Sequence, residues 1–138
     1  MSLNFVAIIV ASVVQFVIGA VWYMPLFGKL WAKIHGFNEL SPEAQKESQK
    51  GMAPLLFAQF IVTVVTTVVL AMFLPVLPLE WNPYGIAGFF WLGFVVPTQV
   101  GGVLFGGTKP EWMVTKILIS AGGSLACLMA ATFVLTHM

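Results

Sequence analysis

Several polar side chains lie deep inside otherwise apolar stretches of this chain, where a polar group needs a hydrogen-bond partner or a polar substrate. Counting about 1.5 Å of helix per residue from the end of each stretch places four of them in one layer, roughly 9–14 Å deep. These are Gln15, Gln59, Gln99 and Ser120, and the layer is extended by Thr63, Thr66, Thr98 and Ser124. The layer predicts either a path for a substrate or ion, or hydrogen bonds that hold helices together, worth about 0.6–2 kcal/mol each. None of these side chains is ionised, so the layer offers no obvious proton carrier.

No residue pattern predicts catalysis or a bound metal. Arg and Asp are absent, and neither His35 nor His137 has a second ligand at metal spacing. Glu80 and Glu111 lie at opposite ends of the apolar stretches, so they cannot form a carboxylate pair. We therefore expect no enzymatic activity, no metal and no cofactor.

Basic and aromatic residues gather at two places next to the apolar stretches. Lys29, Trp31 and Lys33 follow the first stretch, and Lys109 and Lys116 lie where the fourth begins. Such lysines reach along the membrane surface with their charged ends in water. A pair of ammonium groups also binds an anionic lipid headgroup. These five residues are the predicted headgroup contacts.

A proline lies near the middle of the third stretch. Pro97 removes the hydrogen bond that the Gly93 carbonyl would otherwise accept, and Thr98 or Gln99 can satisfy that carbonyl instead. The pattern predicts either a gate or cation ligand at Gly93, or a static kink stabilised by packing.

Small residues repeat at a spacing of four in the fourth stretch, at Gly122, Ala126 and Ala130. Such a pattern lets two helix backbones approach closely. The glycine pairs 101–102 and 106–107 in and after the third stretch offer a matching surface. The pattern predicts a helix-packing seam, either inside one chain or between two copies of it.

The elements that must position these residues are four apolar stretches, at about 4–24, 52–76, 84–105 and 112–136, in which Lys116 is the one charged residue. Each is long enough for a helix to cross a bilayer, which takes about 20 residues. Only 8% of the residues are charged, whereas soluble domains carry about 25%. The stretches lack the alternation of a membrane β-strand. The sequence therefore predicts an all-α, integral membrane bundle of four transmembrane helices, forming a single domain over residues 1–138.

All six lysines fall at two places, the loop between the first two stretches and the turn into the fourth, and four spans put both on the same side of the membrane. The positive-inside rule puts these loops in the cytoplasm and both termini outside. The longer loop, 25–51, contains Ser41-Pro42-Glu43, which is typical of a helix start, so we expect a short helix at about 42–50. Prolines at 75, 78 and 83 make the outer loop short and stiff, which predicts that the second and third helices are adjacent and antiparallel.

The stretch from Gly19 to Lys33, continuing to Gly36, resembles the opening signature of an uncharacterised bacterial membrane family, domain of unknown function 1761. The start of the second helix at Lys50-Gly51-Met52 and the turn Leu104–Pro110 are similar to it too. The resemblance covers nearly the whole chain. It implies a four-helix inner-membrane protein, and it brings no assigned activity or catalytic residues.

Two functions of different classes follow. The first is a small homo-oligomeric protein of the transport or channel type, which uses the polar layer. The second is a structural, accessory or lipid-binding membrane protein without transport activity, which uses the seam and the basic turns. The first helix lacks the carboxylate that small multidrug carriers use, which argues against proton-coupled export. The expected partners are membrane lipids, further copies of the chain and a larger membrane complex, and the net charge of +1 argues against nucleic acid. The expected location is the bacterial inner membrane.

Overall fold

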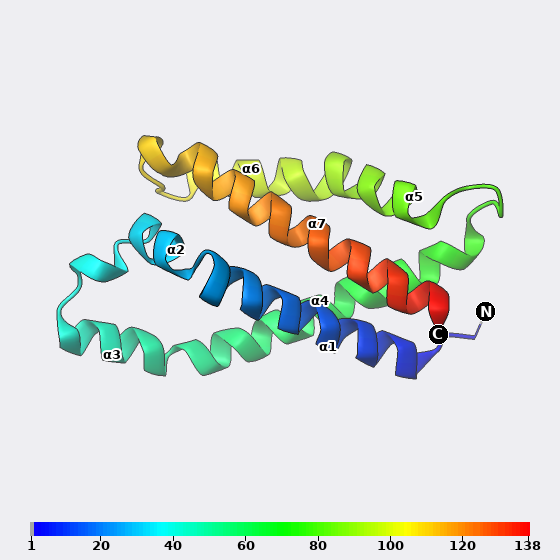
Figure 1. The fold of residues 1–138 in the computed structure, drawn as a ribbon, viewed down its shortest axis with the longest axis horizontal. Coiled ribbons are helices and arrows are strands. Elements are labelled where there is room, and N and C mark those ends of the chain that lie inside the picture. The colour runs from blue at the N-terminus through cyan, green and yellow to red at the C-terminus, as the bar shows by residue number, and fades with distance from the viewer. Residues whose placement is uncertain (1) are drawn as a thin grey trace.

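The computed structural model describes residues 2–138, and within them every regular element is a helix (Figure 1). The first long apolar helix is α1 (Phe5–Val21), prolonged by a π turn (Trp22–Leu26). The second is α4 (Met52–Phe73), and the third joins α5 (Pro83–Phe90) to α6 (Val96–Phe105) through a π turn (Trp91–Val95). The fourth is α7 (Met113–His137), which follows a 3-10 turn (Pro110–Trp112). By length and composition all four are able to cross a membrane, which confirms the predicted all-helical class.

The loop between the first two spans contains α2 (Gly28–Ile34), a short 3-10 turn (Phe37–Glu39) and α3 (Pro42–Lys50). The Ser41 side chain caps α3 by accepting a hydrogen bond from the Ala44 N–H at 3.2 Å, with Pro42 in the first turn. Only Gly51 separates α3 from α4, and its backbone is helical. The charged α3 is therefore a continuation of the second span beyond its apolar part.

The helices pack around α1 and α7, which lie side by side (Figure 1). The second span, α4, packs on α1, whereas α5 and α6 pack on α7. The prediction that the second and third helices are adjacent is wrong for most of their length. They meet near their short loop, where the rings of Phe73 and Phe90 are 5.0 Å apart. The reason is that small residues on α1 and α7 offer each flanking helix a closer approach than the flanking helices offer each other.

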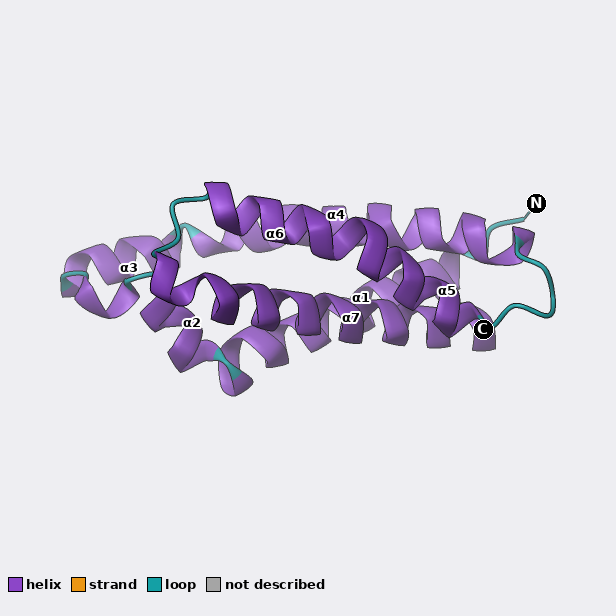
Figure 2. Cartoon of the chain, turned by 90° about the horizontal axis from the view of Figure 1, so that it is seen from above, coloured by secondary structure: helices purple, strands orange, loops and turns teal. Residues whose placement is uncertain are grey.

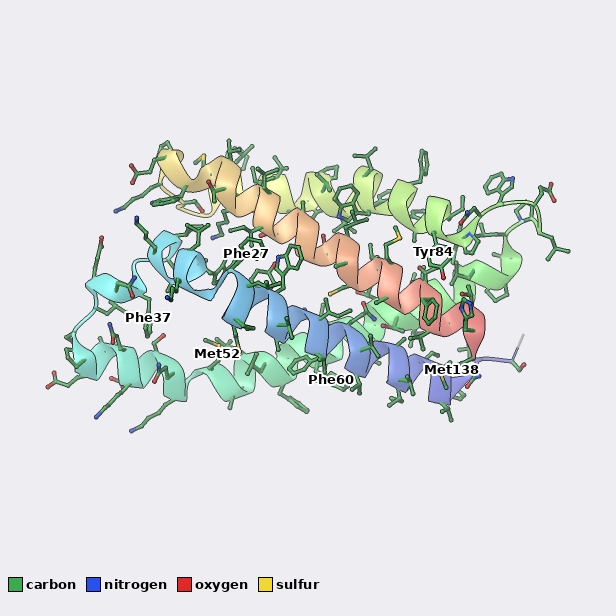
Figure 3. All side chains as sticks on the ribbon, in the orientation of Figure 1. Phe27, Phe37, Met52, Phe60, Tyr84 and Met138 are labelled. Atoms are coloured by element: carbon green, nitrogen blue, oxygen red, sulfur yellow. The ribbon has the colours of Figure 1, made fainter. Side chains whose placement is uncertain are left out.

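The core is small and is built mainly from short side chains. Ala7, Ala11 and Ser12 of α1 are almost completely buried, and Ala131 and Thr132 of α7 are too. The large apolar side chains project outward along all four spans (Figure 3). This is the arrangement expected where lipid, rather than water, covers the outer surface.

Both chain ends lie at one end of the bundle, and the lysine-bearing loops lie at the other (Figures 1 and 2). The Asn4 side chain donates a hydrogen bond to the Met138 carbonyl at 3.2 Å, which ties the two termini together. An even number of spans produces this arrangement. It matches the predicted pairing of the two basic loops on one side.

A π turn lies at or next to the proline in both the first and the third span. The first helix continues past Pro25 through a π turn to Leu26, and the Phe27 N–H bonds to the Trp22 carbonyl at 3.0 Å. In the third span, a π turn before Pro97 shifts the hydrogen-bond register by one residue. The predicted partners of Gly93 bond elsewhere: Thr98 donates to the Phe94 carbonyl at 2.6 Å, and Gln99 turns toward α7.

Candidate functional site

The residues of the predicted polar layer do not form one layer shared by four helices. They separate into two clusters. In the first, Gln15 of α1 donates to the Thr67 hydroxyl of α4 at 2.7 Å and to its own helix at the Ala11 carbonyl. Thr67 in turn donates to the Thr63 carbonyl at 2.7 Å. Gln15 and Thr67 are both buried, so this cluster joins α1 to α4.

The second cluster joins the third span to α7. Gln99 donates to the Ser120 carbonyl at 3.3 Å and accepts a hydrogen bond from the Ser124 hydroxyl at 3.4 Å. The Trp91 indole N–H donates to the Ser124 hydroxyl at 3.0 Å and to the Ala121 carbonyl at 2.9 Å. The predicted Gln99, Ser120 and Ser124 therefore meet, but around a tryptophan rather than around the other two glutamines.

Gln59 belongs to neither cluster. Its side chain is exposed on the outside of α4, and only its main-chain carbonyl is used, by the Thr63 hydroxyl at 2.9 Å. Within residues 2–138, every buried side-chain nitrogen and oxygen atom has a hydrogen-bond partner. The two clusters are thus closed sets of contacts between helices, with no buried polar atom left over to hold a substrate or ion.

The predicted seam on α7 packs against the first span of the same chain at its glycine end. A Cβ atom added at Gly122 would lie 2.8 Å from Cζ2 of Trp22, and one added at Gly123 would lie 3.0 Å from Nε1 of the same ring. The Trp22 indole N–H donates to the Ile119 carbonyl at 2.9 Å. The other seam residues, Ala126 and Ala130, are half-buried. The fully buried small residues of α7 are instead Ala121, Gly123 and Ala131.

The sequence pattern did not predict the roles of the two tryptophans or of Thr67. Trp22 and Trp91 each begin a π turn, and their indole N–H groups donate to α7 carbonyls only two residues apart, at Ile119 and Ala121. Its position near a helix end predicts that Trp22 is an ordinary interfacial tryptophan. The available signal was the glycine pair 122–123, which makes room on α7 for a large ring.

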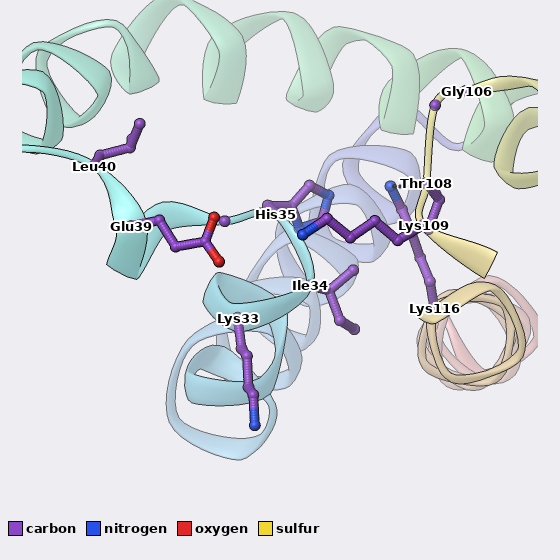
Figure 4. A pocket seen from close by; sticks show the side chains of 11 residues that line it. Lys33, Ile34, His35, Glu39, Leu40, Gly106, Thr108, Lys109 and Lys116 are labelled. Atoms are coloured by element: carbon purple, nitrogen blue, oxygen red, sulfur yellow. Dashed lines mark hydrogen bonds between the residues drawn. The ribbon is translucent and has the colours of Figure 1, made fainter. Parts of the chain in front are cut away.

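Four of the five predicted headgroup residues meet at the lysine-bearing end of the bundle. A cavity of about 520 Å³ opens there between the end of α2 and the turn from α6 to α7 (Figure 4). We call it the basic pocket. Its lining residues are Lys33, Ile34, His35, Gly36, Glu39, Leu40, Gly106, Gly107, Thr108, Lys109 and Lys116. Trp31 borders it through contacts with Lys116 and His35, whereas Lys29 does not line it.

A reciprocal pair of lysine–tryptophan contacts joins the two sides of the basic pocket. Lys33 of α2 places its ammonium nitrogen 5.5 Å from the ring centre of Trp112, at the start of α7. Lys116 of α7 places its own ammonium nitrogen 5.7 Å from the ring centre of Trp31, in α2. Each cation–π contact is worth about 0.5–1 kcal/mol at an exposed site. The pair therefore holds α2 against the start of α7.

The charged groups that line the basic pocket are mostly cationic. The Lys116 ammonium group lies 3.4 Å from the Thr108 hydroxyl oxygen. In Figure 4 the side chain of Lys109 extends toward His35, while that of Lys33 points to the other side. The pocket lining carries three lysines against one glutamate, Glu39. In the part of the chain that the structure describes, no three His, Cys, Asp or Glu side chains gather as a metal site would require.

Two glycines in left-handed conformations shape the pocket walls. Gly36 has a φ of 69° and ends α2, and Gly107 has a φ of 78° and follows α6. They are the two positive-φ residues of the described chain, and both line the basic pocket. A residue with a Cβ atom adopts this conformation at a cost of roughly 1–2 kcal/mol. The backbone at both walls therefore depends on glycine.

Four long apolar helices with closed polar contacts between them define a small multi-pass membrane protein. The chain belongs to the family described as protein of unknown function (DUF1761), whose model matches residues 6–136. No curated protein and no solved structure matches it. Parts of two segments that carry the family resemblance, residues 33–36 and 106–109, line the basic pocket together.

Proposed function

We propose that this protein is an inner-membrane, lipid-binding protein that holds the phosphate of an anionic headgroup in the basic pocket. In this proposal it is a binding or accessory protein rather than an enzyme or a transporter. The observation that carries the proposal is the convergence of Lys109, Lys116 and Thr108 in one cavity beside the apolar spans. Two ammonium groups and a hydroxyl donor suit a phosphate, and the neighbouring spans leave room for acyl chains in the bilayer.

The charge distribution supports this ligand class. A lysine near an anionic membrane surface contributes about 1 kcal/mol of attraction. Lys116 is also held in place by Trp31 and Thr108, so less side-chain entropy is lost when a phosphate binds. The positive-inside rule assigns the pocket end of the bundle to the cytoplasm, where anionic lipids are recognised by such basic clusters.

The closed polar clusters favour binding over transport. A substrate path through the membrane needs polar groups that are free to exchange partners, yet Gln15 and Gln99 are each bonded within the chain. Their hydrogen bonds link neighbouring helices in the way that glutamine does in other membrane bundles. The lipid-binding hypothesis therefore has the stronger support of the two that the sequence leaves open.

Native mass spectrometry of the protein released from nanodiscs tests the proposal. The nanodiscs would contain phosphatidylcholine with one fifth of phosphatidylglycerol. Replacing Lys109 and Lys116 by Gln removes two pocket charges, and we expect the retained phosphatidylglycerol to bind about thirtyfold more weakly, from about 1 kcal/mol per lysine. The matched control replaces Lys46 and Lys50 of α3 by Gln, which removes the same charge outside the pocket.

Equal losses in the two double variants would overturn the proposal, because they would show attraction to surface charge rather than to a site. A second arm adds glycerol phosphate, a soluble phosphate, to the wild-type protein. Displacement of the retained lipid at low millimolar concentration would show that the pocket takes a soluble ligand and would also overturn the lipid assignment. Loss confined to the pocket variant, with no displacement, supports it.

A further inference from the structure

Among the described residues, the Gln59 side chain in α4 makes no hydrogen bond with the rest of the chain. Gln59 lies seven residues after the start of α4, roughly 10 Å along the helix, and its side chain faces outward. Gln15 and Gln99, at similar depth on other helices, both bond to a neighbouring helix. In residues 2–138 no hydrogen bond involves the Gln59 side-chain amide. An amide without a partner in hydrocarbon costs several kcal/mol.

The face of α4 that carries Gln59 is open in the half of the helix nearer the lysine-bearing loops. Leu55, Val62 and Thr66 lie on the same side as Gln59 by helical spacing, and all are exposed. Two turns further on, Phe73 continues this side and contacts Phe90 of α5. The Thr66 hydroxyl is satisfied within its own helix, by the Val62 carbonyl at 3.1 Å. The open face is therefore apolar except for the Gln59 amide.

We propose that a second copy of this chain packs against this α4 face, and that the two Gln59 amides hydrogen-bond to each other. We call the surface formed by Leu55, Gln59, Val62 and Thr66 the Gln59 face. This inference does not depend on lipid binding in the basic pocket.

A second copy is the occupant that the chemistry favours. A glutamine amide both donates and accepts, so it is complementary to its own copy. Two copies inserted in the same direction are related by a two-fold axis along the membrane normal, which places identical residues at the same depth. Gln59 near that axis therefore meets Gln59 of the other copy. A glutamine hydrogen bond between helices is a common stabiliser of helix association in membranes.

Cysteine crosslinking in liposomes tests this inference, in a Cys127→Ser background that removes the single native cysteine. Leu55→Cys places a thiol on the Gln59 face, one turn from Gln59. Phe57→Cys is the matched control, because Phe57 is as exposed as Leu55 (67% against 65%) but lies on the opposite side of α4. We expect a disulfide-linked dimer from Leu55→Cys and none from Phe57→Cys.

Adding Gln59→Leu to the Leu55→Cys chain tests whether the Gln59 amide itself stabilises the dimer or whether the two helices are merely close together. We expect the dimer dissociation constant, measured by single-molecule photobleaching over a range of protein-to-lipid ratios, to rise about three- to twentyfold. Gln59→Leu removes an exposed polar group, so the fold of the single chain is retained, and the circular dichroism spectrum checks this. Equal crosslinking at positions 55 and 57, none at either, or a dissociation constant unchanged by Gln59→Leu would overturn the proposal. Crosslinking of position 55 to a different protein would overturn it as well.

Discussion

The ring of Trp22 lies directly on Gly122, so close that a Cβ atom at Gly122 would come within 2.8 Å of its Cζ2 atom. The same ring donates its N–H to the Ile119 carbonyl one turn earlier on α7. The glycine thus accommodates a tryptophan of its own chain. This contact links the first and last spans near the lysine-bearing end.

Replacing Gly122 by Ala should therefore destabilise the single chain. The added methyl group must displace a large, hydrogen-bonded ring, and overpacking of this kind costs about 1–3 kcal/mol. Titration of the detergent-solubilised protein with sodium dodecyl sulfate, followed by circular dichroism, measures the change.

The matched control is Gly102→Ala in α6, where nothing lies within 4 Å of an added Cβ atom. This variant should be neutral or slightly stabilising, since alanine favours a helix by up to about 1 kcal/mol over glycine. If the two alanine variants unfold at the same detergent fraction, Trp22 does not rest on Gly122 in the membrane.

A second prediction concerns the hydrogen bond between Gln15 and Thr67. Gln15→Leu and Thr67→Val should each lower stability, because each leaves the other buried group with one partner fewer. A double-mutant cycle should give a coupling of about 0.6–1.7 kcal/mol, the range measured for hydrogen bonds between membrane helices. The matched comparison is Thr98→Val, whose exposed hydroxyl bonds only within its own helix and which should leave unfolding nearly unchanged. A coupling of zero would show that α1 and α4 are not joined at this point.

A third prediction concerns Gly107, a left-handed glycine at the pocket wall. Gly107→Ala should strain the turn by roughly 1–2 kcal/mol and weaken headgroup retention, because the wall that carries Thr108 and Lys109 must move. Gly107→Asn should be tolerated better, since asparagine adopts this conformation more readily. The measurement is the amount of phosphatidylglycerol that stays bound in native mass spectrometry. Identical retention by the two variants would contradict the role given to this glycine.

The orientation of the chain is tested by labelling with a membrane-impermeant maleimide, again in a Cys127→Ser background. Ser2→Cys, at the end that carries both termini, should react in intact cells. Lys46→Cys in α3 should react only after the cells are opened, if the lysine loops are cytoplasmic as the positive-inside rule predicts. The reverse pattern would place the basic pocket on the outer side of the membrane and would contradict the proposed headgroup site.

The sequence predicts well how deep a residue lies in the membrane, but it predicts poorly which way the side chain faces. Long apolar stretches locate the four spans, and the Ser41-Pro42 start locates α3, because both signals are local along the chain. Which side of a helix faces a neighbour depends on rotation about the helix axis. For a helix in lipid, the sequence pattern gives little information about that rotation, since apolar residues cover every side of the helix. Gln15 and Gln59 have similar depth, yet one is buried and the other faces outward.

The gathering of lysines at one end of the bundle was easier to predict than the polar layer for a related reason. The cost of burying charge confines lysines to the membrane surface. Lys33, Lys109 and Lys116 must therefore lie at the end of the bundle where their loops are. Their convergence into one pocket additionally needs the left-handed turns at Gly36 and Gly107, which the sequence analysis did not identify. Thr67 and Trp91 were missed because their partners, Gln15 and Ser124, are distant in the chain.

The central place of α7 has a consequence for the order of assembly during synthesis. The helix that contacts α1, α5 and α6 is the last of the four spans to be made. Until it emerges, Trp22, Trp91 and Gln99 have no carbonyl or hydroxyl on α7 to bond to. The third span therefore lacks its packing partner until the fourth has inserted, whereas α1 and α4 can already pair through the Gln15–Thr67 contact. A chain that ends before residue 113 would hold one helix pair and one separate helix.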